Sequence, residues 1–109
     1  MAIAEVTIIP IGTGTTSLSA YVADMQITLS KQEGITYQLT PMSTIIEGPL
    51  ERLLEVIGIL HEGCFTSGAA RVSTAVKIDD RRDKQASCEQ KMQSVNQKLQ
   101  IQTTKKDLI

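Results

Sequence analysis

Apolar and polar residues alternate along several segments of the chain. Four segments alternate or are rich in β-branched residues and predict strands: residues 2–11, 35–40, 43–47 and 70–78. In the first, Ala4, Val6 and Ile8 share one face, and Pro10 marks the end of the strand or an edge. The strict alternation of residues 35–40 predicts a half-buried strand.

Three other segments repeat apolar residues at spacings of three and four, which predicts helices. Ser17 is the predicted N-cap of the first helix, and Gly34 is its predicted C′ stop. Pro49 is placed in the first turn of the second helix. The apolar stripes are Leu18, Val22, Met25 and Leu29; Leu50, Leu53, Leu54, Ile57, Leu60 and Cys64; and Cys88, Met92, Val95 and Leu99.

The order of these elements predicts an α+β fold of the ferredoxin-like, split βαβ type. Residues 1–42 and 43–83 each supply a β-α-β unit, so two helices cover one face of a four-stranded antiparallel sheet. An extra C-terminal helix follows. We expect one domain over residues 1–102 and a polar tail over 103–109, and we read residues 79–83 as a charged loop.

The second face of this sheet carries Ile3, Thr7 and Ile9, which is too apolar for a free surface. We therefore expect it to pack against another copy of the chain, with the last helix reaching across to the partner. The alternative is a monomer with a partly apolar face.

Composition removes several classes of function. The chain of 109 residues has a net charge of −1 and only 3% aromatic residues, which disfavours nucleic-acid binding. Two cysteines and one histidine do not make a structural zinc site; the cysteines are interpreted as small buried side chains, although a disulfide stays open. The N-terminus does not resemble a signal peptide and no apolar run reaches ~20 residues, so we expect a cytoplasmic protein without a membrane span.

No catalytic motif is present in the sequence. It has no phosphate loop, nucleophile elbow or HExxH, and Gly12-Thr13-Gly14 lacks the third glycine of a dinucleotide loop. His61 is interpreted as a helix-end histidine that meets terminal carbonyls or solvent. We therefore expect neither an enzyme nor a cofactor.

Residues 41–48 form the most informative segment. Ser43 and Glu47 share one face of the predicted strand, on either side of Ile45. A hydroxyl and a carboxylate beside an aliphatic wall suit an aminopyrimidine, whose amino group can donate to the carboxylate. The alternative is that Glu47 caps the next helix or stays in solvent. Ser17, Ser19 and Tyr21 supply further hydroxyls near the end of the first strand.

Three stretches of the chain together resemble a known family. Residues 41–48 match the pattern hydrophobic-x-Thr-x-x-Glu-Gly, and residues 71–84 and 10–22 resemble its last strand with a charged loop and its first crossover. The chain, over roughly residues 3–100, is thereby identified as similar to the thiamine-binding ferredoxin-like family. The resemblance implies a β-α-β-β-α-β fold with an added C-terminal helix, dimers that pair into tetramers through their sheets, and no enzymatic activity.

The same resemblance implies a small heteroaromatic ligand, thiamine or hydroxymethylpyrimidine, bound by Ser43, Thr44 and Glu47 with Thr7 from the adjoining strand. Two other functions stay open. One is a structural or protein-interaction module that assembles through the sheet face and the last helix. The other is an enzyme of an unrecognised type, because ferredoxin-like folds host many chemistries.

Overall fold

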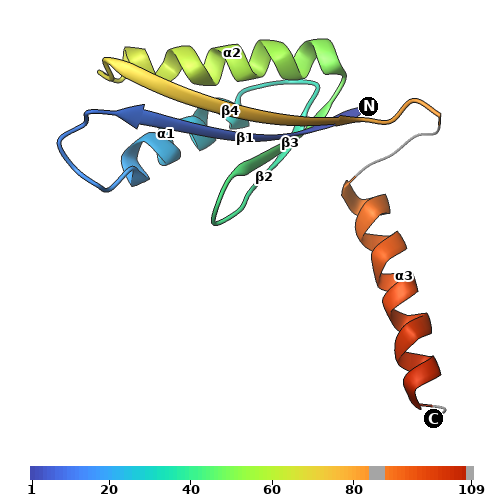
Figure 1. Ribbon diagram of the computed structural model, residues 1–109. Helices are drawn as coiled ribbons and strands as arrows, with labels where there is room; N and C mark the ends of the chain where they lie inside the picture. Colours follow the sequence, from blue (N-terminus) through green and yellow to red (C-terminus); the bar gives the residue numbers. More distant parts are fainter. Residues whose placement is uncertain (84–87, 108–109) are drawn as a thin grey trace.

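The computed structural model describes residues 1–83 and 88–107. Its elements are β1 (Ala2–Ile11), α1 (Ser19–Ser30), β2 (Thr36–Leu39), β3 (Thr44–Gly48), α2 (Leu50–Thr66), β4 (Arg71–Asp80) and α3 (Cys88–Asp107). The sheet is antiparallel with strand order β2-β3-β1-β4 (Figure 1). This arrangement confirms the predicted α+β ferredoxin-like fold with an additional C-terminal helix.

The core lies on one face of the central strand β1. Only alternate residues of β1 are buried, because a strand presents successive side chains to opposite faces. Ala2 and Ala4 are small, so the helices can approach the sheet closely. The buried apolar cluster comprises Ala2, Ala4, Val6, Ile8, Leu29, Ile46, Leu53, Val56, Leu60 and Cys64. Both α1 and α2 contribute to this single cluster. On the opposite face of the sheet, which we call the open face, the only helical contacts among the described residues come from the first turn of α3.

The start and end of α1 differ from the prediction. Leu18 is the N-cap residue and makes no side-chain capping bond, so the assignment of Ser17 was wrong. The Ser17 backbone N–H instead donates to Thr15 Oγ1 at 3.2 Å, which holds Ser17 in the preceding loop. At the other end the helix stops at Ser30, with Lys31 as its C-cap. Gly34, with φ of +80°, therefore turns the chain toward β2 and is not the C′ residue.

The apolar stripe of α2 is rotated relative to the prediction. Leu54 is 52% exposed, whereas Val56, absent from the predicted stripe, is fully buried. The reason is that α2 packs against α1 as well as against the sheet, so its buried side is turned toward α1. Pro49 lies one position before the helix, as its N-cap.

The two edge strands also correct the sequence reading. All four residues of β2 are exposed, so the prediction of a half-buried strand was wrong. Tyr37 and Leu39 pair with Ile46 and Thr44 of β3, but they lie at the margin of the packed core. At the other edge, β4 continues through Asp80, so Asp79 and Asp80 belong to the strand and not to a loop.

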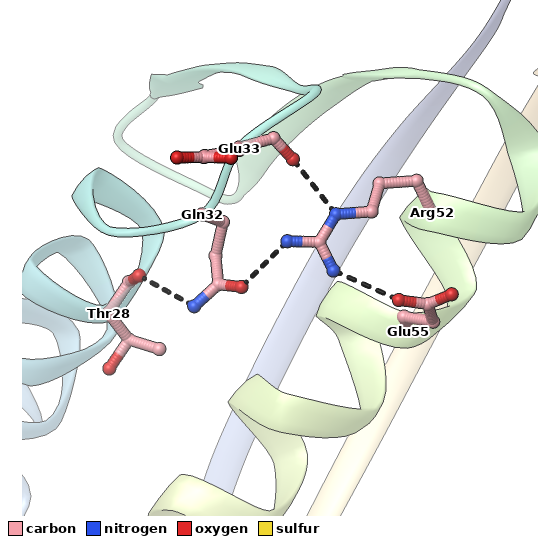
Figure 2. Close-up of polar contacts among 5 residues, drawn as sticks. All are labelled: Thr28, Gln32, Glu33, Arg52 and Glu55. Carbon is pink, nitrogen blue, oxygen red and sulfur yellow. Dashed lines mark hydrogen bonds and ion pairs between the residues drawn. The ribbon is translucent and has the colours of Figure 1, made fainter.

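Arg52 of α2 ties the turn after α1 to the second helix (Figure 2). Its Nε donates to the Glu33 carbonyl at 2.9 Å, and Nη2 donates to Gln32 Oε1 at 3.0 Å. Gln32 Nε2 in turn donates to the Thr28 carbonyl at 3.2 Å, while Arg52 Nη1 pairs with Glu55 at 3.0 Å. One guanidinium thus fixes the chain between α1 and β2.

The last residue of β3 must be glycine for a steric reason. Gly48 is buried, and a Cβ placed on it would lie 2.9 Å from the Gly34 carbonyl oxygen and 3.1 Å from Ile35. The Glu47-Gly48 pair therefore combines a side chain on the open face with a close approach of two backbone segments.

Helix α3 extends away from the sheet (Figure 1). The radius of gyration is 17.5 Å, against ~13 Å for a compact domain of this length. Its predicted apolar stripe exists, and Met92, Val95 and Leu99 are all exposed. The helix continues to Asp107, while residues 108–109 of the predicted tail lie outside the described residues. The division into a domain and a tail stays a prediction. No helix in the described part of the chain has the length and apolar character needed to cross a membrane.

Candidate functional site

The central strand β1 is longer than its neighbour β3. Along one side, β4 pairs with β1 from Ala2 to Ile11, whereas along the other side β3 pairs only from Ala2 to Val6. In the described structure, residues 7–11 of β1 therefore have no strand partner on the β3 side. We call this gap the notch. It is bounded by β1, the start of α1 and the turn between β2 and β3.

A pocket of about 700 Å³ lies at the notch. This volume falls within the range of small-molecule sites. Its apolar lining comprises Val6, Ile8, Ile9, Leu18, Val22, Ala23, Met25, Leu29, Leu39, Pro41, Met42 and Leu60. Its polar lining comprises Thr7, Ser19, Gln26, Thr40, Ser43 and Thr44. These polar side chains are all neutral, so the pocket suits an uncharged or weakly polar ring better than a phosphate.

The turn that closes one side of the pocket is organised by Thr40. Its Oγ1 donates to the Ser43 carbonyl at 2.8 Å and accepts from the Ser43 backbone N–H at 3.0 Å. The Ser43 hydroxyl lies 3.3 Å from the same oxygen. These contacts fix Pro41 and Met42 at the tip of the turn and hold the Ser43 hydroxyl at the pocket wall.

Gln26 of α1 reaches across to β3. Its Nε2 donates to Thr44 Oγ1 at 3.3 Å in a partly buried contact. Because the Thr44 hydroxyl accepts this bond, its own proton stays available for a second acceptor. Sequence reasoning missed both Gln26 and Thr40. The helical period does place Gln26 beside Val22 and Met25 of the apolar stripe, which was the available signal.

The structure brings together three of the four predicted ligand-binding residues. Thr7, Ser43 and Thr44 all line the pocket, and so does Ser19. Glu47 does not line it. Glu47 pairs with Ile3 at the opposite end of β3, ~13 Å along the strand from Ser43. Within β3, Ile45 and Glu47 lie on the open face, opposite Glu5 and Ile3 of β1, while Ser43 precedes the strand in the turn.

Glu47 lies instead at the start of α3. The Cys88 side chain is hydrogen bonded to the Glu47 carboxylate. Burial, and then the negative charge of Glu47, raise the pKa of the Cys88 thiol. Lys91, one turn further along α3, forms an ion pair with Asp79 of β4. The first turn of α3 is thus attached to the end of the sheet by two polar contacts.

The single histidine lies outside the pocket. His61 Nδ1 lies 2.6 Å from Thr74 Oγ1 of β4, and its ring meets the Phe65 ring edge-on with centroids 5.5 Å apart. The sequence predicted a contact with terminal helix carbonyls or solvent, whereas the structure places His61 half-buried against the edge strand β4. Both cysteines are free thiols; Cys64 is buried and Cys88 is half-buried.

Comparison with known proteins places this architecture in a family. The family model described as thiamine-binding protein matches residues 4–96. The UPF0045 protein YqgV of Bacillus subtilis is 58% identical over 103 residues, covering 92% of this chain and 99% of the relative. A UPF0045 protein of Staphylococcus xylosus is 46% identical over 102 residues, covering 91% and 95%.

Solved structures agree with the fold. The crystal structure of the MJ1052 protein of Methanocaldococcus jannaschii superposes with a TM-score of 0.79 at 30% identity, covering 87% of this chain and 95% of that one. A Thermotoga maritima protein assigned provisionally to thiamine biosynthesis or salvage superposes with a TM-score of 0.68 at 19% identity, covering 86% and 97%. At 19% identity, the similarity to the Thermotoga maritima protein supports the fold alone. From the family model and the relatives it follows that the chain belongs to the thiamine-binding protein family, also known as UPF0045.

Proposed function

We propose that the protein is a non-catalytic, cytoplasmic binding protein for thiamine or its hydroxymethylpyrimidine half, and that it works as a homo-oligomer. The observation that supports this most is the pocket at the notch. It combines an aliphatic lining with hydroxyls from Thr7, Ser43 and Thr44, which the family resemblance had already singled out. Membership of a thiamine-binding family supports the choice of thiamine or its pyrimidine half as the ligand.

The proposed mechanism is capture of a ring. Apolar side chains from β1 and α1 exclude water from the two faces of the pyrimidine. Thr44, held by Gln26, donates its remaining proton to a ring nitrogen, and Ser43 offers its hydroxyl beside it. Backbone groups of residues 7–11 that have no strand partner on the notch side supply further hydrogen-bonding capacity.

Glu47 keeps a proposed role on the same face of the sheet. A ligand that extends from Ser43 over Ile45 would reach the Glu47 carboxylate after ~13 Å. The exposed amino group of an aminopyrimidine, or the cationic ring of thiamine, suits that carboxylate. The open face would then be covered by a second copy of the chain, which closes the site from solvent.

A thermal-shift titration with thiamine and hydroxymethylpyrimidine tests the proposal. Ligand at ~100 times its dissociation constant adds ~2.7 kcal/mol, which raises Tm by roughly 10 °C for a domain of this size. Ser43→Ala should weaken binding ~3- to 10-fold, the value of one neutral hydrogen bond. Ser30→Ala, which alters a hydroxyl bonded to Ile27 outside the pocket, is the matched control.

The variants separate the two parts of the site. If Ser43→Ala weakens binding and Glu47→Gln does not, the ligand stays within the notch. If neither ligand shifts Tm, the capture mechanism is wrong.

The second candidate is a protein-interaction module. The observation that favours it is the exposed apolar stripe of α3, which extends from the sheet. Analytical ultracentrifugation of the full chain and of one carrying Val95→Asp distinguishes the two. A monomeric wild-type chain that binds no ligand favours the interaction module, because its stripe then needs a different partner.

A further inference from the structure

One polar side chain at the pocket in the notch differs in kind from the others. The remaining polar lining consists of hydroxyl groups, from Thr7, Ser19, Thr40, Ser43 and Thr44. A hydroxyl can rotate to donate or to accept, so it can serve ligands with either hydrogen-bonding pattern. A carboxamide has separate donor and acceptor atoms, and among the described residues that line the pocket only Gln26 of α1 carries one. Discrimination between ligands of similar shape therefore depends on Gln26.

The carboxamide of Gln26 has its donor engaged and its acceptor free. Nε2 donates to Thr44 Oγ1 at 3.3 Å, and both side chains are half-buried. In the described part of the chain, Oε1 has no hydrogen-bond partner. Every fully buried side-chain oxygen or nitrogen of the described residues does have a partner, so Oε1 is not fully buried. Since Gln26 lines the pocket, a ligand there can donate a hydrogen bond to this oxygen.

Gln26 and Thr44 together present an acceptor beside a donor. The two polar atoms of a carboxamide are neighbours, so Oε1 lies next to the contact between Nε2 and Thr44 Oγ1. The Thr44 hydroxyl accepts from Gln26 and keeps its own proton for the ligand. A 4-aminopyrimidine has the complementary edge, an amino group that donates beside a ring nitrogen that accepts. A 4-oxopyrimidine has the reverse edge, a carbonyl that accepts beside a ring N–H that donates.

We propose that Gln26 selects 4-aminopyrimidines against 4-oxopyrimidines, because its Oε1 accepts a hydrogen bond from the amino group. The inference rests on the proposed function and names the feature of the ligand that the pocket recognises. A 4-oxo ligand places its carbonyl against Oε1 and its ring N–H against the Thr44 proton, so neither contact forms. The opposite preference requires the opposite orientation of the carboxamide. The preference for one ligand therefore reports this orientation directly.

Isothermal titration calorimetry of the full chain with thiamine and with oxythiamine, its 4-oxo analogue, tests the proposal. The two ligands share the thiazolium ring and the overall shape, so the ratio of their dissociation constants isolates the edge that Gln26 recognises. The wild-type chain should bind thiamine about 10- to 100-fold more tightly, the value of one or two mismatched hydrogen bonds.

Three variants separate the carboxamide from the rest of the pocket. Gln26→Leu removes the acceptor at similar size and should reduce the ratio to less than ~3. Gln26→Glu keeps an acceptor at the same position and should keep the preference for thiamine. Ser43→Ala is the matched control, because a hydroxyl can serve either ligand. Both affinities should fall in this variant, and their ratio should stay near the wild-type value.

The ratio and binding itself distinguish this proposal from the proposed function. Thiamine binding together with equal or tighter oxythiamine binding overturns the role of Gln26 and leaves ligand capture at the notch standing. A Gln26→Leu chain that keeps the wild-type ratio, or a Gln26→Glu chain that loses it, has the same meaning. If Gln26→Leu does not fold, the Gln26→Glu and wild-type ratios decide. Binding of neither ligand by the wild-type chain overturns both proposals.

Discussion

Replacing Arg52 by alanine should destabilise the fold through the turn between α1 and β2. The guanidinium makes three contacts, and they differ in value. The two bonds that the charged guanidinium donates, to the Glu33 carbonyl and to Gln32 Oε1, contribute ~1 kcal/mol each, less than a buried charged donor because the side chain is 27% exposed. The ion pair with Glu55, whose side chain is 65% exposed, contributes ~0.3 kcal/mol.

The expected loss for Arg52→Ala is therefore about 2 kcal/mol of unfolding free energy. Urea unfolding followed by circular dichroism measures it from the change in midpoint at constant slope. Differential scanning calorimetry should show a decrease in Tm of roughly 10 °C. Arg52→Lys should recover part of the loss, because an ammonium can reach only some of the three acceptors.

Glu55→Gln is the matched control for Arg52→Ala. It removes only the exposed ion pair and leaves the contacts with Glu33 and Gln32, so it should cost less than ~0.5 kcal/mol. If Glu55→Gln costs as much as Arg52→Ala, or if Arg52→Ala costs less than ~0.5 kcal/mol, the interpretation of Arg52 as a clamp on the turn is refuted.

Three further predictions follow from packing and charge. Gly48→Ala should destabilise by about 1–3 kcal/mol in the same urea assay, because the added Cβ must displace a backbone carbonyl; a neutral result would show that the two segments separate freely. The hydrogen bond from Arg82 lowers the pKa of Asp80, so its contribution is complete above the unfolded value of ~3.9 and is lost as the pH falls through the lower folded value. NMR titration of Arg82→Gln should therefore show the Asp80 pKa raised, and an unchanged value would count against the contact. Glu47→Gln should lower the pKa of Cys88 and speed its alkylation by iodoacetamide at pH 8, whereas an unchanged rate would mean that burial alone controls the thiol.

The sequence predicted those parts of the fold in which a single hydrophobic period runs through the whole segment. Residues 2–11 alternate cleanly, and one face of β1 is buried as expected, because a strand with one buried face requires that period. The choice between Leu54 and Val56 was not predictable in the same way. Both lie near the apolar side of α2, and which of them is buried depends on how far the helix is turned toward α1. The rotation of α2 is set by its tertiary contacts with α1 and the sheet, which the pattern of apolar residues does not specify.

The site was predictable only in part. Thr7, Ser43 and Thr44 came from the family resemblance, and the structure places them together because β1 extends past the end of β3. The difference in strand length cannot be read from the sequence pattern. Gln26 and Thr40 were missed because each is a single polar residue whose role depends on its contacts with Thr44 and Ser43.

The size of the pocket depends on the length of the β2–β3 hairpin, because β3 begins at Thr44 and, among the described residues, leaves residues 7–11 of β1 unpaired on that side. If this hairpin were two residues longer on each arm, the added part of β3 would pair with residues 7–8 of β1 and fill part of the notch with backbone. Insertions at the turn around Pro41 and Met42 would thus adjust the size of the ligand, or abolish binding, without replacing any residue of β1 or α1 that lines the site. Designed variants with shorter or longer turns should therefore differ in the size of ligand that they accept, while the core stays unchanged.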